Sequence, residues 1–119
     1  MFKETLREML ERCEGGLASA LMGFDGIAVD SYAPPGSSRD GETVGMELSH
    51  VLGQIRQAVE SLEAGGLEEV TIRSSRLIVV LRALSEEYFL ALAMRPDGNL
   101  GKGRYLARIT APKLKKNLE

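Results

Sequence analysis

Two short stretches of continuously apolar sequence constrain the fold of this 119-residue chain more than any other feature. Residues 77–81 read Leu-Ile-Val-Val-Leu and residues 89–94 read Phe-Leu-Ala-Leu-Ala-Met. Runs of this kind are typical of strands that are covered on both faces. Residues 84–87 predict a turn between them, so the two strands should be antiparallel neighbours. We therefore expect a sheet with helices packed on each of its sides.

Three segments have the apolar periodicity of amphipathic helices and can supply that cover. They are residues 2–13, residues 42–64 and residues 99–118. The second is the longest, and its apolar stripe runs from Val44 to Leu62 before Gly65 and Gly66 end it. We expect Pro112 to kink or split the third helix.

Three further strands complete the expected sheet. Two lie within residues 17–33, on either side of a Phe-Asp-Gly turn at residues 24–26, and the third lies within residues 67–74, where apolar and polar residues alternate. Residues 33–41 are rich in Pro, Gly and Ser and predict an exposed, mobile loop. The expected order is α-β-β-α-β-β-β-α. It describes one domain of the α/β (α+β) class, spanning residues 1–119, with a five-stranded, largely antiparallel sheet.

The composition excludes most kinds of catalytic and metal site. Cys13 and His50 are the only residues of their types, which rules out disulfide frameworks and multi-cysteine or multi-histidine metal sites. Cys13 lies on the apolar stripe of the first helix and is interpreted as a small buried side chain. The acidic pairs at residues 68–69 and 86–87 lie at strand edges or turns, where solubilising carboxylates are common. We expect no enzymatic activity, no cofactor and no metal.

The charge is unevenly distributed along the chain, although its net value is −2. Residues 1–94 carry 8 basic and 15 acidic side chains, whereas residues 95–119 carry 7 basic and 2 acidic ones. The basic segment either complements the C-terminal end of the last helix or forms a docking face for an acidic partner or a membrane surface. It lacks the series of interleaved aromatic residues that nucleic-acid binding favours, so no nucleic-acid partner is expected.

No part of the sequence predicts insertion into a membrane. No apolar run approaches the roughly eighteen residues of a spanning helix. The N-terminal segment is amphipathic and acidic, unlike a signal peptide. We expect a cytoplasmic protein.

One glycine-rich pattern lies before the last helix. Residues 98–103 read Gly-Asn-Leu-Gly-Lys-Gly, follow a strand and open a helix, a position where phosphate groups bind in other folds. Their spacing matches neither the phosphate-binding loop nor the dinucleotide fingerprint. We interpret Asn99 as a helix cap and the glycines as packing positions. An anion cradle beside Lys102 and Arg104 is the alternative.

A second pattern lies on the long helix, where small or polar residues recur at i+4 beside the apolar stripe. These residues are Gly45, Ser49, Gly53 and Gln57. Each glycine inside a helix costs about 1 kcal/mol relative to alanine, so local stability does not explain them. They predict a ridge that faces away from the core and lets another backbone approach closely, or else a solvated face without a role.

In this order of elements, the sequence resembles the roadblock/dynein light chain family and, within it, the bacterial MglB-like members. The resemblance covers about residues 4–116 and rests on small and apolar patterns at residues 17–29, 45–62, 77–81 and 98–101. It implies a profilin-like α/β/α sandwich that forms a homodimer or a heterodimer. It also implies that the long second helices lie side by side and that the middle strand pairs across the dimer axis through Val70, Thr71, Ile72 and Arg73.

The resemblance also implies a function. Family members regulate, scaffold or activate small Ras-like GTPases, and others are light chains of motor complexes. MglB-like members bind the GTPase on the paired long helices and stimulate hydrolysis by repositioning the GTPase's own residues, without an arginine finger. For this chain, the implied GTPase-binding or dimer face comprises Gly45, Ser49, His50, Gly53, Gln54 and Gln57. A purely structural adaptor, with no effect on GTP hydrolysis, is the alternative.

Overall fold

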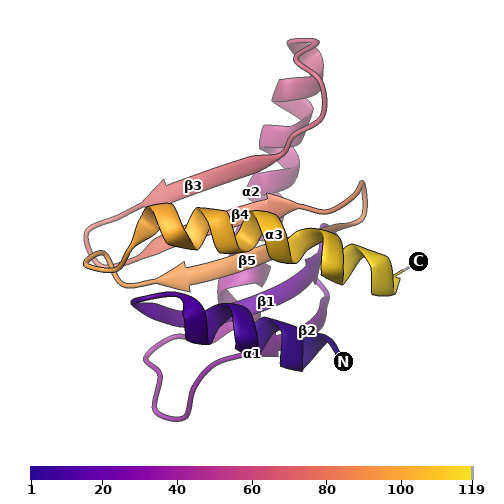
Figure 1. Cartoon of the computed structure of the whole chain (residues 1–119). Helices are drawn as coiled ribbons and strands as arrows, with labels where there is room; N and C mark the ends of the chain where they lie inside the picture. Colours follow the sequence, from indigo (N-terminus) through magenta and orange to yellow (C-terminus); the bar gives the residue numbers. More distant parts are fainter. Residues whose placement is uncertain (119) are drawn as a thin grey trace.

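A five-stranded antiparallel sheet forms the middle layer of the protein (Figure 1). The computed structural model describes residues 1–118, and its strands are β1 (Gly16–Gly23), β2 (Ala28–Tyr32), β3 (Glu69–Arg73), β4 (Ile78–Ala83) and β5 (Tyr88–Met94). They are arranged in the order β2-β1-β5-β4-β3, so the two continuously apolar strands, β4 and β5, are neighbours inside the sheet. The expected five strands and their antiparallel pairing are confirmed.

Helices cover both faces of this sheet, as the apolar strands require. α1 (Phe2–Arg12) and α3 (Leu100–Leu118) pack on one face, and α2 (Gly41–Ser61) packs on the other (Figure 1). Successive side chains of a strand point to opposite faces. Val80 therefore joins the core under α1 and α3, whereas Val79 and Leu81 join the core under α2. The expected order of elements and the three-layer sandwich are confirmed.

The Pro- and Gly-rich loop before α2 is anchored to its surroundings. The Ser37 hydroxyl donates a hydrogen bond of 2.7 Å to the carbonyl oxygen of Leu17 in β1. The Asp40 carboxylate accepts one of 2.8 Å from the Thr43 hydroxyl and caps the helix. Residues 33–41 were expected to form an exposed, mobile loop. Residues 33–40 are connected by these bonds to the sheet and to α2, which begins at Gly41, one residue earlier than expected.

The last helix is continuous, so of the two expected effects of Pro112, a kink or a split, the split is wrong. α3 runs from Leu100 to Leu118 with Pro112 inside it. A proline in a helix leaves the carbonyl group four residues earlier without its N–H partner. Pro112 and Arg108 both lie on the exposed side of α3, where water can take over that bond.

The C-terminal half of α2 extends past the edge strand β3 (Figure 1). The apolar stripe of this helix was expected to face the core along its whole length, yet Leu52 is its one fully buried member, with 1% exposure. Val51 and Leu62 are 43% and 76% exposed. The sheet is too narrow to cover all of the helix, which leaves apolar side chains of α2 at the surface.

Candidate partner-binding surfaces on the long helix

α2 presents three strips of side chains with different chemistry. The strip against the sheet is buried and consists of Gly41, Gly45, Ser49 and Leu52. On one side of it lies an apolar flank, made of Val44, Leu48, Val51, Ile55 and Leu62, all of them half-buried or exposed. On the other side lies a polar flank, made of His50, Gly53, Gln54 and Gln57. The residues expected to form one functional face are therefore divided between the buried strip and the polar flank.

Gly45 and Ser49 face the sheet, which corrects the expectation that they belong to a ridge facing away from the core. A Cβ atom at Gly45 would collide with the side chain of Met22 in β1. Ser49 is only 5% exposed, and its hydroxyl donates a hydrogen bond of 2.9 Å to the carbonyl oxygen of Met46. The i+4 spacing predicted close approach of another backbone, whereas the group that meets Gly45 is the Met22 side chain of β1 in the same chain. Spacing alone does not tell which side of a helix meets the sheet.

The polar flank borders a shallow hollow, hereafter the polar hollow, of about 220 Å³. It is lined by Phe24, Ser49, His50, Gly53, Gln54, Arg56 and Gln57. Five of the six residues expected on the functional face thus meet at one site, and Gly45 is excluded from it. A Cβ atom at Gly53 would have no neighbouring atom within 4 Å. Nothing in the chain itself therefore requires a glycine at this position.

Arg56 and Phe24 form the rigid border of the polar hollow, and sequence reasoning missed both. The Arg56 guanidinium lies 3.9 Å from the centroid of the Phe24 ring and donates a hydrogen bond of 2.6 Å to the carbonyl oxygen of Glu86. The Phe24 ring in turn lies 5.2 Å from that of Phe89 in the core. The sequence placed Phe24 at a turn, but it did not show the contact with Arg56, which lies 32 positions further along the chain on α2.

The apolar flank of α2 faces the same side of the sheet as the apolar residues of β3. Val70 and Ile72 are half-buried and pack against the core under α2, whereas Thr71 and Arg73 point to the opposite face and are exposed. The expected alternation in this strand is confirmed. In the described part of the chain β3 pairs with β4 alone, so its other edge is free.

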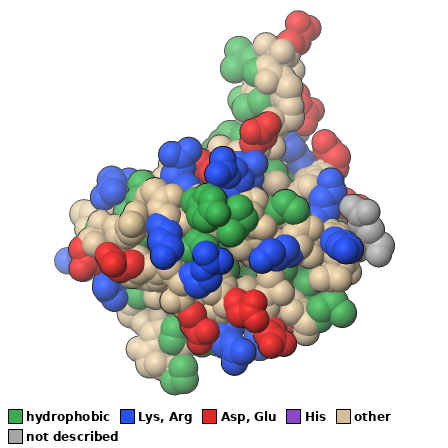
Figure 2. Space-filling model, viewed as in Figure 1, with side chains coloured by type: hydrophobic (Ala, Val, Ile, Leu, Met, Phe, Trp, Pro, Cys, Tyr) green, Lys and Arg blue, Asp and Glu red, His purple; other side chains and the backbone are tan. Residues whose placement is uncertain are grey.

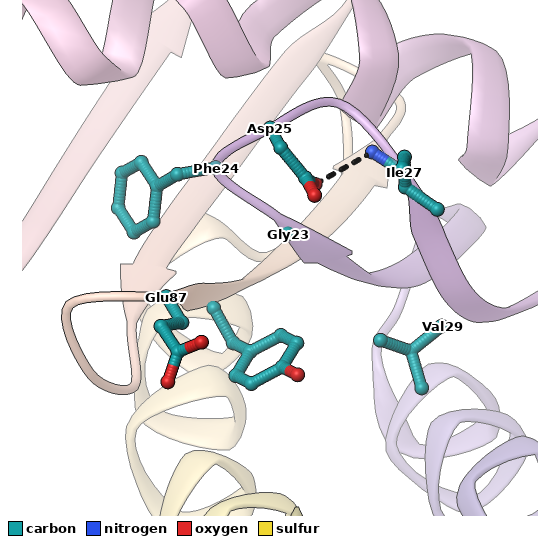
Figure 3. A pocket seen from close by; sticks show the side chains of 7 residues that line it. Gly23, Phe24, Asp25, Ile27, Val29 and Glu87 are labelled. Carbon is teal, nitrogen blue, oxygen red and sulfur yellow. Dashed lines mark hydrogen bonds between the residues drawn. The ribbon is translucent and has the colours of Figure 1, made fainter.

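A second hollow, of about 370 Å³, lies at the β1–β2 turn (Figure 3). It is lined by Gly23, Phe24, Asp25, Ile27, Val29, Glu87 and Tyr88. The Asp25 carboxylate accepts a hydrogen bond of 3.0 Å from the Ile27 amide and is therefore engaged in the turn. The ladder between β1 and β2 is irregular at Val29, which has no register partner. The sequence predicted the turn but not this irregularity.

In the glycine-rich segment before α3, Asn99 caps the helix and Gly103 packs closely as expected, whereas Gly101 is exposed and is not a packing position. The Asn99 carboxamide oxygen accepts a hydrogen bond of 3.0 Å from the Lys102 amide. The Gly98 amide donates to Arg95 and the Gly103 amide to Asn99, each at 3.0 Å. A Cβ atom at Gly103 would lie 3.0 Å from the sulfur of Met94. These amides are already bonded within the chain, which argues against an anion cradle.

Cys13 is buried between α1, the sheet and α3, as its position on the apolar stripe predicted. Its exposure is 5%, and burial raises the pKa of its thiol, an effect that nearby Lys102 partly offsets. A protonated, buried thiol is a poor nucleophile. Among residues 1–118, no three His, Cys, Asp or Glu side chains lie close enough to hold a metal ion.

No family model and no curated protein matches this sequence, but solved structures do. The Roadblock/LC7 domain from Streptomyces avermitilis has the same fold, with a TM-score of 0.85 and 12% identity over 98% of this chain and 96% of that one. MglC from Myxococcus xanthus is 40% identical over 96% of each chain, with a TM-score of 0.70. The chain belongs to the roadblock/LC7 family. The resemblance stated from the sequence patterns is confirmed.

This roadblock protein also shares its fold with the gliding protein MglB from Thermus thermophilus. The TM-score is 0.83, and identity is 16% over 95% of this chain and 84% of that one. The sequence is thus more similar to the Myxococcus MglC than to this MglB, while the fold is common to both. The expected α/β/α sandwich is the fold of the family.

Proposed function

We propose that this roadblock protein is a dimeric, non-catalytic regulator of a small Ras-like GTPase and that α2 is its binding surface. One observation carries the proposal. A single chain leaves two surfaces of α2 uncovered, and their chemical character differs. One is the apolar flank, whose exposure to water is unfavourable, and the other is the polar hollow around Gly53. Two different partners, a second roadblock chain and a GTPase, fit these two surfaces.

The apolar flank supports a dimer. Val51 and Leu62 expose 43% and 76% of their surface, and the apolar surface continues onto the sheet at Val70 and Ile72. Contiguous exposed apolar surface is characteristic of a protein interface. The free edge of β3 offers backbone groups that a second strand can pair with. We place the dimer axis beside β3, with residues 70–73 pairing across it; a related roadblock chain could replace the second copy.

The polar hollow supports the binding of a GTPase. A Cβ atom at Gly53 would meet no atom of this chain within 4 Å, so the chain's own packing does not require a glycine there, whereas an approaching molecule would. His50, Gln54 and Gln57 offer hydrogen-bonding groups around it, and Phe24 offers an apolar wall. We propose that the GTPase surface enters here. A GTPase partner would place the protein in the cytoplasm.

Regulation without a catalytic group agrees with the chemistry of these surfaces. His50 is the single histidine of the chain and is exposed on α2, and Cys13 is buried at another site. Arg56 is held by Phe24 and by Glu86, so it is not free to act as an arginine finger. The protein would therefore act by holding the GTPase in one conformation, so that the GTPase's own residues perform the hydrolysis.

Phosphate release by the Ras-like GTPase encoded nearest to the gene of this protein tests the proposal. The GTP-loaded GTPase is mixed with increasing amounts of the roadblock protein, and binding is followed in parallel by calorimetry. Binding with faster phosphate release is expected. Binding without faster release would indicate the adaptor role, and absence of binding would contradict the proposal.

A further inference from the structure

The outer face of α3 carries positive charge that the neighbouring residues do not balance. α3 contains six basic and no acidic residues, and all six basic side chains are exposed. They are Lys102, Arg104, Arg108, Lys113, Lys115 and Lys116, hereafter the α3 basic face. Within residues 1–118, Arg104 alone among them forms an ion pair, at 2.7 Å from the carboxylate of Glu69. That carboxylate also lies 3.7 Å from Arg82, so it is shared between two arginines.

The neighbouring helix does not cancel this charge. α1 carries three basic and three acidic residues, so the layer formed by α1 and α3 has nine basic and three acidic side chains, a net charge of +6. The rest of the sequence has six basic and fourteen acidic residues, a net charge of −8. The net charge of −2 for the whole chain therefore conceals one strongly cationic layer.

Most of α2 is too distant for its acidic residues to screen this layer, whereas Glu60, near the C-terminal end of α2, lines one hollow together with Lys115. α2 lies on the opposite face of the sheet (Figure 1), and packed layers of protein are separated by about 10 Å each. The Debye length at physiological ionic strength is about 8 Å. A negatively charged surface that approaches α3 would therefore interact mainly with the basic layer.

The residue types on the α3 basic face suit a lipid surface. Figure 2 shows basic side chains on both sides of a hydrophobic patch over α3. Tyr105 is 46% exposed there, and the Arg108 guanidinium lies 5.6 Å from its ring centroid. Tyrosine and basic residues are the side chains that gather at membrane interfaces. The face follows a helix about 28 Å long, and Arg104, Tyr105 and Arg108 also border a hollow of about 730 Å³ beside the sheet edge.

We propose that the α3 basic face adsorbs the protein to a membrane that is rich in anionic phospholipids. The long Lys and Arg side chains contact headgroups, and Tyr105 lies at the level of those headgroups without deep insertion. In the described part of the chain, no helix is long and apolar enough to cross a membrane. The proposal is independent of the GTPase, because α3 and α2 lie on opposite faces of the sheet and can bind at the same time.

Vesicle co-sedimentation tests the proposal. The full chain is mixed with vesicles of phosphatidylcholine that contain phosphatidylserine, or with phosphatidylcholine alone, at about 0.15 M salt. The chain should sediment with the anionic vesicles only. Replacement of Lys113, Lys115 and Lys116 by Gln should weaken this binding at least about tenfold, because each basic residue near an anionic surface contributes to the attraction.

A matched variant distinguishes the effect of the α3 basic face on vesicle binding from the effect of net charge. Replacement of Arg39, Arg76 and Arg95 by Gln removes the same charge from exposed positions outside α3 and should leave vesicle binding within about twofold of the wild type. An equal loss of vesicle binding in both triple variants would overturn the assignment of the lipid-binding surface to α3. Glutamine is a good helix former, so circular dichroism should show that both variants fold.

A tryptophan reporter tests where the face meets the lipid. The chain contains no tryptophan, so Tyr105→Trp introduces a single fluorophore on the α3 basic face. Its emission should shift to the blue with anionic vesicles and stay unchanged with phosphatidylcholine. An unchanged spectrum with both vesicle types would overturn the proposal. Capture of the chain by immobilised polyglutamate, without any binding to the anionic vesicles, would also overturn it and would indicate an acidic protein partner.

Discussion

The Arg56 guanidinium lies 3.9 Å from the centroid of the Phe24 ring, and this stack connects α2 to the β1–β2 turn. The same guanidinium donates a hydrogen bond of 2.6 Å to the carbonyl oxygen of Glu86, in the β4–β5 turn. One side chain thus joins the two segments that border the polar hollow, α2 and the β1–β2 turn, to the β4–β5 turn. A partner that binds there meets a surface whose shape is set before binding, which lowers the entropic cost of association.

Loss of this stack should destabilise the fold. Arg56→Ala removes a cation–π contact and a hydrogen bond from a side chain that is 24% exposed, and the free energy of unfolding should fall by about 1–2 kcal/mol. Arg56→Lys keeps the charge but not the planar group, so it should restore less than half of the loss. Urea denaturation of the three proteins measures the effect. Equal stability of wild type and Arg56→Ala would contradict the structural role.

Substitution by alanine should change the stability of the protein in opposite directions at Gly45 and at Gly53, two glycines of α2 with different surroundings. Gly45→Ala places a methyl group against Met22 and should destabilise the protein by about 1–3 kcal/mol. Gly53→Ala meets open space and should stabilise it by up to about 1 kcal/mol through helix propensity. Thermal and urea unfolding of this matched pair check the signs. A stabilising Gly45→Ala would show that this part of α2 does not pack closely on β1.

Burial of Cys13 should make stability fall at alkaline pH. Burial raises the pKa of its thiol above the ordinary value of 9.0, against a smaller opposing effect of Lys102. Above about pH 9 the unfolded chain therefore loses this proton before the folded chain does, and the free energy of unfolding decreases as pH rises. Cys13→Ala removes this contribution. The stability difference between wild type and variant should shrink from about pH 8 to about pH 10, and a constant difference would contradict the burial effect.

Disruption of the apolar flank should yield a monomer. The wild type should have twice the 13.0 kDa mass of one chain by light scattering. Val51→Glu places a carboxylate in the proposed interface and should give 13.0 kDa, because an unpaired charge is costly to bury. Met46→Glu is the matched control, since Met46 is 50% exposed on the polar side of the same helix. If the Val51→Glu protein remained dimeric, the dimer interface would not lie on the apolar flank.

Much of the fold could be predicted because local patterns determine it. The doubly apolar strands β4 and β5 required cover on both faces, and that requirement together with the helical stripes yields the observed three layers. The surfaces of α2 were harder to predict. Gly45 and Gly53 look alike in the sequence, yet one packs on Met22 and the other borders open space. The difference depends on where β1 passes beneath the helix, which no periodicity encodes.

The polar hollow was predicted only in part for the same reason. Its α2 residues recur at helical spacing and could be grouped from the sequence, whereas Phe24 comes from a distant turn. The exposure of Leu62 likewise depends on the width of the sheet relative to the length of α2. Such tertiary relationships arise only when the elements are assembled.

The affinity of the GTP-loaded GTPase for the wild type and for Gly53→Arg tests whether the GTPase binds at the polar hollow. The variant adds a bulky side chain at a position where a Cβ atom would meet nothing within 4 Å, so we expect its circular dichroism spectrum and its dimeric mass to be unchanged. Gly53→Ala serves as the small control. Gly53→Arg should bind the GTPase at least about tenfold more weakly, a loss of about 1.4 kcal/mol or more. Wild-type affinity in a folded, dimeric Gly53→Arg protein would contradict binding at the polar hollow.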